Sequence, residues 1–147
     1  SRRLIIDAGR LEGRFLSSYS ARKLGLRTTG NAGGAYNLRL TSTQTSAEDD
    51  FGAMLAKLDR GILVTELIGQ GFNPVTGDYS RGACGFWVEN GRIDHAIEGF
   101  TIAGNILDMM QRLEAAGADA LVAGERTCAS LLFADLGISG SRADDDA

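Results

Sequence analysis

Histidine and cysteine, which most metal sites and disulfide scaffolds depend on, are scarce in this chain of 147 residues: it has one histidine and two cysteines. A Zn²⁺ site usually takes three or four histidine, cysteine or carboxylate ligands, and no pair of histidines stands at helical spacing here. We therefore expect no metal and no cofactor in this chain. The distant Cys84 and Cys128 favour a reducing, cytoplasmic setting, with a single disulfide between them as the alternative.

Long apolar runs are lacking as well. No stretch of the sequence reaches the roughly 18 apolar residues that a membrane-spanning helix needs, so we expect no membrane partner. No charged-then-apolar leader is visible at the N-terminus, which begins with Ser1 rather than Met. These absences leave a domain that closes one hydrophobic core, for which 44% hydrophobic residues are enough.

The net charge of −4 is unevenly distributed along the chain. Residues 1–40 contain eight Lys or Arg against two acidic residues, whereas residues 41–147 contain seven against seventeen. A basic segment can bind nucleic acid, but aromatic rings for base stacking are sparse in residues 1–40. We favour a basic face that packs against the acidic remainder or a partner subunit, and nucleic acid is the less favoured partner.

Three segments carry helix signals. A hydroxyl cap, two basic residues near the end and a final glycine predict a short helix over residues 17–25. Two longer amphipathic helices are predicted, one from Ser46 with Asp49 as its capping-box partner and one from near Asn105. Glycines are expected to end them, Gly61 for the first and Gly117 for the second, with apolar stripes formed by Phe51, Met54, Leu55 and Leu58 and by Ile106, Met109, Met110 and Leu113.

Strands are predicted over residues 4–6, 37–43, 62–68 and 131–138, with 62–68 well buried. Together with the helices they indicate an α+β domain with a mainly antiparallel sheet, or a barrel-like form of it, and two to three helices. The polar segment 139–147 is expected to be disordered, so the domain covers residues 1–140 and residues 141–147 form an acidic tail.

The clearest local signal is Asn90-Gly91, which suits a two-residue hairpin turn because both residues must adopt positive φ. A regular ladder from this turn would pair Glu89 with Arg92, Val88 with Ile93, Trp87 with Asp94 and Phe86 with His95. Because side chains alternate between faces, the predicted core face holds Cys84, Phe86, Val88, Ile93, His95 and Ile97.

Nucleophilic catalysis has little support. Ser80 lies in the glycine-flanked segment 77–82, but one place too late for a G-x-S-x-G nucleophile elbow. His95 is the only imidazole available as its base, and the predicted register points it into the core. A self-sufficient hydrolase built on Ser80 and His95 is therefore a weak third hypothesis.

The segment 65–82 leaves one predicted strand and enters the next through glycines and the only proline. It is either a structured loop whose polar groups satisfy its own backbone or a recognition loop on a rigid sheet, and spacing alone favours neither. If it recognises a substrate or partner, the candidate binding residues are Gln70, Asn73, Asp78, Tyr79, Ser80 and Arg81.

This segment also carries a resemblance. Residues 63–83 (LVTELIGQGFNPVTGDYSRGA) and 85–91 (GFWVENG) resemble the PmbA branch of the TldD/PmbA peptidase family. Residues 19–25 (YSARKLG), 28–34 (TTGNAGG) and 101–105 (TIAGN) are similar to that branch in the same order. The likeness extends over about residues 15–140.

The resemblance implies the C-terminal domain of a PmbA-type subunit without its N-terminal domain, and a role in proteolysis of peptides or unfolded proteins. It implies a cytoplasmic heterodimer in which a TldD-type partner carries zinc on an H-E-x-x-x-H helix plus a late cysteine. This sequence has no such motif, and Cys128, near the place of the late cysteine, has no histidine co-ligands. The expected role is thus a zinc-free, substrate-binding partner; the alternative, from an older family label, is a nucleic-acid or DNA gyrase-associated module.

Overall fold

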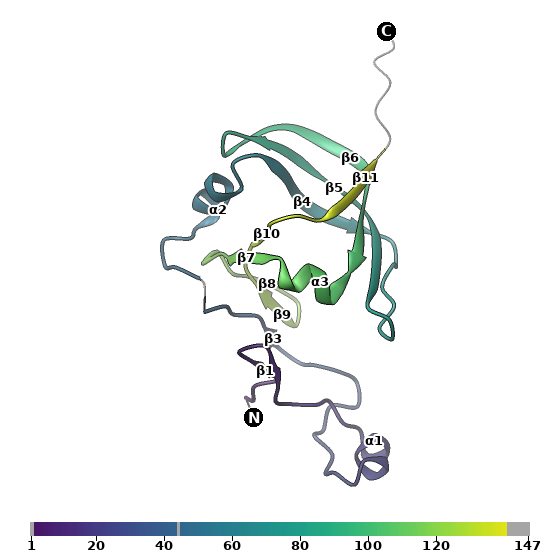
Figure 1. The fold of residues 1–147 in the computed structure, drawn as a ribbon. Coiled ribbons are helices and arrows are strands. Elements are labelled where there is room, and N and C mark those ends of the chain that lie inside the picture. The colour runs from purple at the N-terminus through teal and green to yellow at the C-terminus, as the bar shows by residue number, and fades with distance from the viewer. Residues whose placement is uncertain (1, 44, 141–147) are drawn as a thin grey trace. The chain divides into compact units, whose positions relative to one another are not determined.

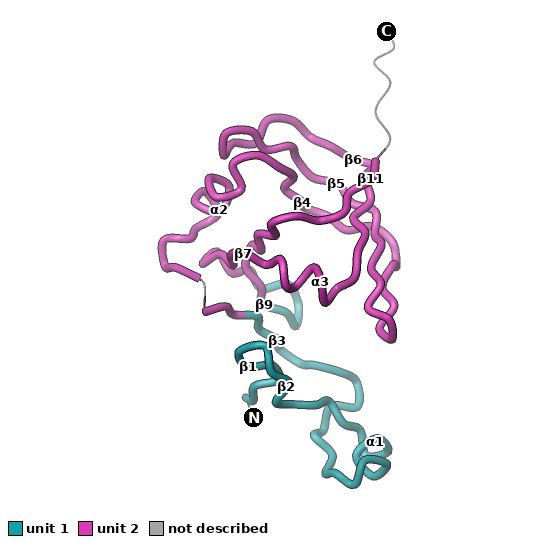
Figure 2. Tube along the Cα trace, viewed as in Figure 1, with its two compact units in different colours: residues 1–40, 122–127 teal, residues 41–121, 128–147 magenta. Residues whose placement is uncertain are grey.

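A computed structural model describes residues 2–43 and 45–140 of the chain. It divides into two compact units (Figure 2). Unit 1 comprises residues up to 40 together with 122–127, and unit 2 comprises residues 41–121 together with those from 128 onward. The predicted tail, residues 141–147, lies outside the described residues.

Unit 2 is built on a four-stranded antiparallel sheet in the order β11-β6-β5-β4. Its strands are β4 (Gly61–Ile68), β5 (Asp78–Glu89), β6 (Arg92–Asn105) and β11 (Gly137–Gly140). The long strands curve, and helix α3 (Ile106–Gln111) lies on the concave side (Figure 1). There Met109 of α3 packs with Ala83, Phe100 and Ile102 of the sheet to form the buried core.

The hairpin between β5 and β6 turns at Asn90 and Gly91, whose φ values are +52° and +69°. Glu89–Arg92 and Val88–Ile93 pair as predicted. A β-bulge between Trp87 and Val88 then shifts the ladder by one residue. The predicted pairing of Trp87 with Asp94 and of Phe86 with His95 is therefore wrong: Trp87 faces His95, and Phe86 faces Ala96.

The predicted core face of this hairpin is only partly right. Val88 is completely buried, but Ile93 is 45% exposed. The side chain of His95 is 60% exposed and pairs with Asp94 at 2.8 Å between Nδ1 and Oδ2. Because this end of β6 extends beyond the core, the prediction that His95 is a core histidine is wrong.

The helix α2 (Phe51–Leu58) begins later than predicted. Its N-cap is Asp50, whose side chain accepts from the amide of Ala53 at 2.8 Å. Asp49 turns inward, where it is 4% exposed and pairs with Lys57. Its carboxylate also accepts from the amide of Ser46 at 3.1 Å, so the predicted contact between these two residues is present although the helix does not begin there. Of the predicted apolar stripe, Met54 is buried, whereas Phe51 is 43% exposed. The helix ends at Leu58, and Gly61 opens β4 rather than closing the helix.

Helix α3 is shorter than predicted. Asn105 caps it and Asp108 lies in its first turn, as the sequence indicates, but the helix ends at Gln111. The next residues form strand β7 (Leu113–Ala116), because they pair with β10 (Leu131–Phe133). The single strand expected over residues 131–138 is thus two strands, β10 and β11, and β11 includes residues 139–140 of the predicted tail.

Unit 1 contains helix α1 (Ser18–Lys23), which begins with the capping box formed by Ser17 and Ser20. A short hairpin joins β1 (Ile6–Asp7) to β2 (Arg10–Leu11). Most of a small three-stranded sheet also lies in this unit, with β9 (Arg126–Cys128) between β3 (Leu38–Arg39) and β8 (Leu121–Ala123). The strand predicted over residues 37–43 is reduced to β3, and both of its residues are exposed.

The class is α+β, as predicted, and the antiparallel ladders dominate; β3 and β9 form the one parallel pair among the described residues. The main sheet is open, so the barrel-like form is not adopted. Among residues 2–43 and 45–140, no helix is both long and apolar enough to cross a bilayer.

Candidate functional site

Four of the six candidate binding residues lie in a strand rather than in a loop. We expected the chain to re-enter the sheet at Ala83, but β5 already begins at Asp78. Residues 71–73 fold back along its start: the amide of Ser80 donates to the carbonyl of Gly71 at 2.7 Å, and that of Asn73 donates to Asp78 at 2.8 Å. The loop proper is therefore residues 69–77, which extends the β4–β5 hairpin.

The tip of this loop is held by its own polar groups. The side-chain oxygen of Asn73 accepts from the amide of Val75 at 2.9 Å, and its carbonyl accepts from the amide of Gly77 at 2.8 Å. The hydroxyl of Thr76 donates to the carboxylate of Asp78 at 2.6 Å. The self-satisfied loop considered from the sequence is thus present, and Asn73 is one of its structural residues.

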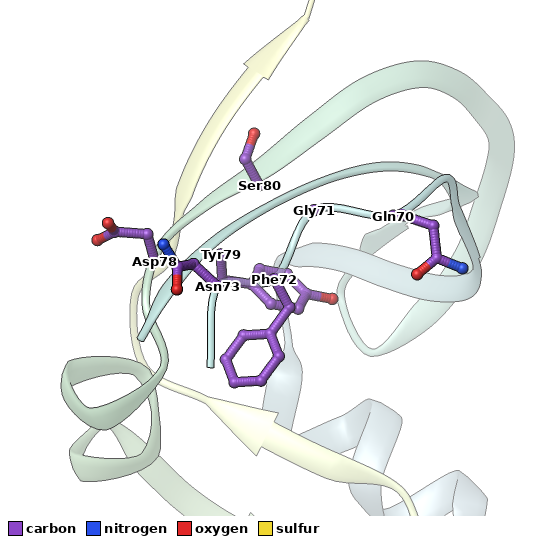
Figure 3. A pocket seen from close by; sticks show the side chains of 7 residues that line it. All are labelled: Gln70, Gly71, Phe72, Asn73, Asp78, Tyr79 and Ser80. Carbon is purple, nitrogen blue, oxygen red and sulfur yellow. The ribbon is translucent and has the colours of Figure 1, made fainter. Parts of the chain in front are cut away.

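Beside this loop is an open hollow of about 380 Å³. Five of the six candidates line it, together with two residues that sequence reasoning missed (Figure 3). Those two, Gly71 and Phe72, lie in the same segment between predicted residues, so their positions alone could have suggested them. The lining residues are Gln70, Gly71, Phe72, Asn73, Asp78, Tyr79 and Ser80.

The side chains around the hollow spread outward rather than converging on one point (Figure 3). Phe72 is 53% exposed, while Tyr79 packs against the core. Asp78 makes no ion pair with any described residue. An open, mixed polar and apolar surface of this kind suits non-covalent contact with an extended chain better than enclosure of a small molecule.

Ser80 and His95 are not brought together. Ser80 pairs with Ala103 in the β5–β6 ladder, and His95 lies eight residues further toward the hairpin turn. At about 3.3 Å per residue this is roughly 25 Å along the strand. The geometry therefore offers no serine nucleophile with a histidine base among the described residues.

Arg81 does not line the hollow. Its Nη2 donates to the carbonyl of Leu67 at 3.0 Å, which ties β5 to the end of β4. Its Nε is buried and makes no hydrogen bond with any described residue. Arg81 thus supports the strand beside the hollow, whereas the sequence had grouped it with the contact residues.

Strand β4 lies at an edge of the sheet. Within the described part of the chain it pairs with β5 alone, so its other side presents unpaired backbone groups. Its last residues are exposed, with Leu67 at 39% and Ile68 at 54%, and the strand leads directly into the loop beside the hollow. The end of β4 therefore leads directly into the residues that line the hollow.

The two cysteines are free thiols. Burial raises the pKa of the Cys84 thiol, and the Glu66 carboxylate, whose Oε2 lies 3.8 Å from Sγ, raises this pKa further. Burial also raises the pKa of Cys128, whose Sγ lies 3.3 Å from the carbonyl of Ala129. Both pKa shifts favour the protonated thiol, whereas a metal is bound by the thiolate.

The donors that zinc requires are not gathered in the described part of the chain. Among the described residues, no three His, Cys, Asp or Glu side chains come close enough together to hold a metal ion. The one histidine is exposed and engaged with its neighbour Asp94. No chemical step through a metal can be assigned to these residues.

Known proteins are similar to this chain over nearly its whole length. Residues 1–140 match the model of the PmbA/TldA metallopeptidase C-terminal domain. The chain belongs to this family. It is 47% identical over 139 residues to the metalloprotease PmbA of Escherichia coli O157:H7 and 41% identical over 139 residues to the PmbA homolog of Haemophilus influenzae. Each alignment covers 95% of this chain but 30% of the relative, so the chain spans about a third of their length.

Two crystal structures share this fold. One is of a proposed modulator of a DNA gyrase from Thermotoga maritima, with 35% identity and a TM-score of 0.78 over 92% of this chain and 32% of that one. The other, from Bacteroides thetaiotaomicron, is also described as a proposed modulator of DNA gyrase. It has 30% identity and a TM-score of 0.81 over 96% of this chain and 31% of that one.

Proposed function

We propose that this domain is the peptide-binding and partner-supporting part of a PmbA-type subunit, and that it supplies no metal ligands of its own. The family membership and the relatives' names support a place in a metalloprotease. The donor set of the chain supports a role other than holding the metal. Zinc and the hydrolytic step then belong to a TldD-type partner subunit, as in the heterodimer that the sequence resemblance implies.

The free edge of β4, a strand that leads directly into the residues lining the hollow, carries this proposal. An extended peptide can add to such an edge through main-chain hydrogen bonds. Because every peptide has the same main chain, this mode accepts many sequences and suits unfolded clients. The exposed Phe72 and the carboxylate of Asp78, which makes no ion pair with any described residue, would add side-chain contacts at the end of the strand.

The test uses the full-length protein reconstituted with a TldD-type subunit and a fluorogenic extended peptide. A peptide that is N-methylated at consecutive residues loses the donors of both its edges, whereas one methylated at alternate residues keeps one intact edge. We expect cleavage of the unmodified and alternately methylated peptides and little cleavage of the consecutively methylated one. Equal cleavage of all three would contradict recognition through the main chain.

Two substitutions test the site from the protein side. Arg81→Ala removes the tie between β5 and the end of β4, and Asp78→Ala removes the carboxylate at the hollow. Each is expected to raise KM for the peptide or to weaken docking of the partner. Arg92→Ala, at the far end of the hairpin, is the matched control and should leave both unchanged. No change for either site variant would count against this location.

A second function is favoured by the eight Lys and Arg of residues 1–40 and by the description of both similar structures as proposed gyrase modulators. A nucleic-acid-binding domain would show affinity that falls steeply as the salt concentration rises. Gel-shift titrations of the full-length protein with double-stranded DNA at low salt decide this. Absence of DNA binding at low salt would exclude the second function.

The two free thiols agree with a protein that works in the cytoplasm, where disulfides are kept reduced. We include this location in the proposal. Cells lysed directly into denaturant with an alkylating reagent, without prior reduction, are expected to yield both Cys84 and Cys128 as alkylated thiols.

A further inference from the structure

The side chain of Asn105 joins three elements of unit 2. Its Nδ2 donates to the carbonyl of Thr76 at 2.9 Å, and its Oδ1 accepts from the amide of Leu107 at 3.1 Å. Asn105 is also the last residue of β6 and the N-cap of α3. One amide group therefore connects the sheet, the start of a helix and the tip of the loop beside the hollow.

The other bonds that hold this loop tip are mostly local. They join Asn73 to Val75 and Gly77, and Thr76 to Asp78. Apart from Asn105, the amide of Ile106 provides a longer-range bond, to the carbonyl of Gly77 at 2.8 Å. Loops held by local bonds alone open at little cost in free energy, so these two ties decide how well the tip is fixed.

Gly77 shows that the loop and Asn105 are closely fitted. Its φ of +80° is one that residues with a side chain rarely adopt, and a Cβ here would lie 3.0 Å from Nδ2 of Asn105. The backbone can approach the amide group this closely because glycine has no side chain. The contact with Thr76 therefore depends on the shape of the loop as well as on the asparagine.

We propose that Asn105 is a positioning residue, which holds loop 69–77 in the conformation that binds peptide. This inference rests on the proposed function, because it assigns to Asn105 the role of holding in place the loop that lines the same hollow. Residues 70–73 of the loop line that hollow directly beyond β4. If the loop is competent only part of the time, the apparent affinity for peptide falls by the competent fraction.

Two variants separate the roles of the side chain. Asn105→Ser keeps an oxygen that can cap α3, since serine is among the best N-cap residues, but it is too short to reach the carbonyl of Thr76. Asn105→Ala loses both the cap and the tie. Asp50→Ala is the matched control: it removes the N-cap of α2 in the same unit and touches no bond of the loop.

The experiment uses the full-length protein, alone for hydrogen exchange and with its TldD-type subunit for cleavage of a fluorogenic peptide. For Asn105→Ser we expect faster exchange of the amides of residues 75–77 and unchanged exchange in β5 and β6. KM should rise by up to about tenfold, the effect of one lost hydrogen bond, with kcat unchanged. Asn105→Ala should show the same rise in KM and a lower Tm, and Asp50→Ala a lower Tm alone.

The outcomes are distinguishable. A loop that exchanges faster in Asn105→Ser while KM stays constant overturns the positioning role and leaves the proposed function standing. Unchanged hydrogen exchange in the loop of Asn105→Ser would show that Asn105 does not fix the loop, and this also overturns the inference. If consecutive N-methylation of the peptide has no effect on the wild-type complex, the proposed function fails, and the positioning role fails with it.

Discussion

Gly71 is the position at which one added methyl group should do the most damage to the candidate site. A Cβ built there would lie 1.5 Å from the carbonyl oxygen of Ser80 and 2.6 Å from its carbonyl carbon. A carbon and a carbonyl oxygen approach each other to about 3.3 Å at the closest. In Gly71→Ala the two segments must therefore separate by well over an ångström.

That separation breaks the hydrogen bonds that fold the loop back on β5, from Ser80 to Gly71 at 2.7 Å and from Asn73 to Asp78 at 2.8 Å. At about 1 kcal/mol each, the loss is about 2 kcal/mol in the free energy of opening this part of the hairpin. Such a change corresponds to roughly 30-fold faster hydrogen exchange at the amide of Ser80. Because the hollow is lined by the same residues, peptide binding should fall in parallel.

Gly82→Ala is the matched control, since a Cβ there meets Ile68 at 3.6 Å, which is an ordinary contact. It should leave both the exchange of Ser80 and the cleavage of peptide close to wild type. Exchange measured by mass spectrometry on the two full-length variants gives the comparison directly. Equal protection of Ser80 in both variants would refute the reasoning from close approach.

Three further predictions concern other parts of unit 2. The pKa of Cys84 is raised by burial and by Glu66, so its alkylation by iodoacetamide should need a more alkaline pH than that of an ordinary thiol, and Glu66→Gln should lower the midpoint of the pH–rate curve. The pKa of the Asp49 carboxyl is lowered, chiefly by the hydrogen bond from Lys57 at 2.6 Å. Lys57→Met should therefore reduce stability toward urea at neutral pH, and the deficit should shrink as acid protonates the carboxyl. Val88→Ala, at a fully buried site, should cost about 2 kcal/mol of unfolding free energy in urea titrations.

Features of the fold that depend on neighbouring residues were predictable from the sequence. The turn at Asn90 and Gly91 follows from the positive φ that both must adopt, and the cap of α1 follows from Ser17 with Ser20. The cap of α3 at Asn105 was found for the same reason. In each case the deciding bond joins residues at most three positions apart.

Features that depend on distant partners were mispredicted. Ser46, Asp49 and Asp50 can all cap a helix, but Asp50 is the N-cap, while the Asp49 carboxylate pairs with Lys57, eight positions further along the chain. Residues 113–116 continue a helical pattern but pair with β10 instead. The bulge after Trp87, which reverses the orientation expected for His95, leaves no trace in an alternating pattern.

The same distinction applies to the candidate site. Five of the six candidate residues line the hollow. They could be predicted because a glycine-rich segment dense in polar side chains indicates a hairpin loop. Arg81 was grouped with them, although its guanidinium turns back to the carbonyl of Leu67 at the end of β4. The sequence could not predict the open edge of β4 or the hydrogen bond from Asn105 to Thr76, since both depend on the order of strands in the sheet.

The edge of β4 has few of the features that usually protect an exposed strand. Lysine, proline and inward-pointing charges prevent such edges from pairing with other chains. Residues 61–68 (GILVTELI) contain neither lysine nor proline, and their only charge is Glu66. A bulge near Thr65 is the one irregularity, and beyond it Leu67 and Ile68 remain exposed. An edge with so little protection and with a hollow at its end is suited to pairing with another chain, and the peptide proposed to bind here would pair through main-chain atoms that every peptide has.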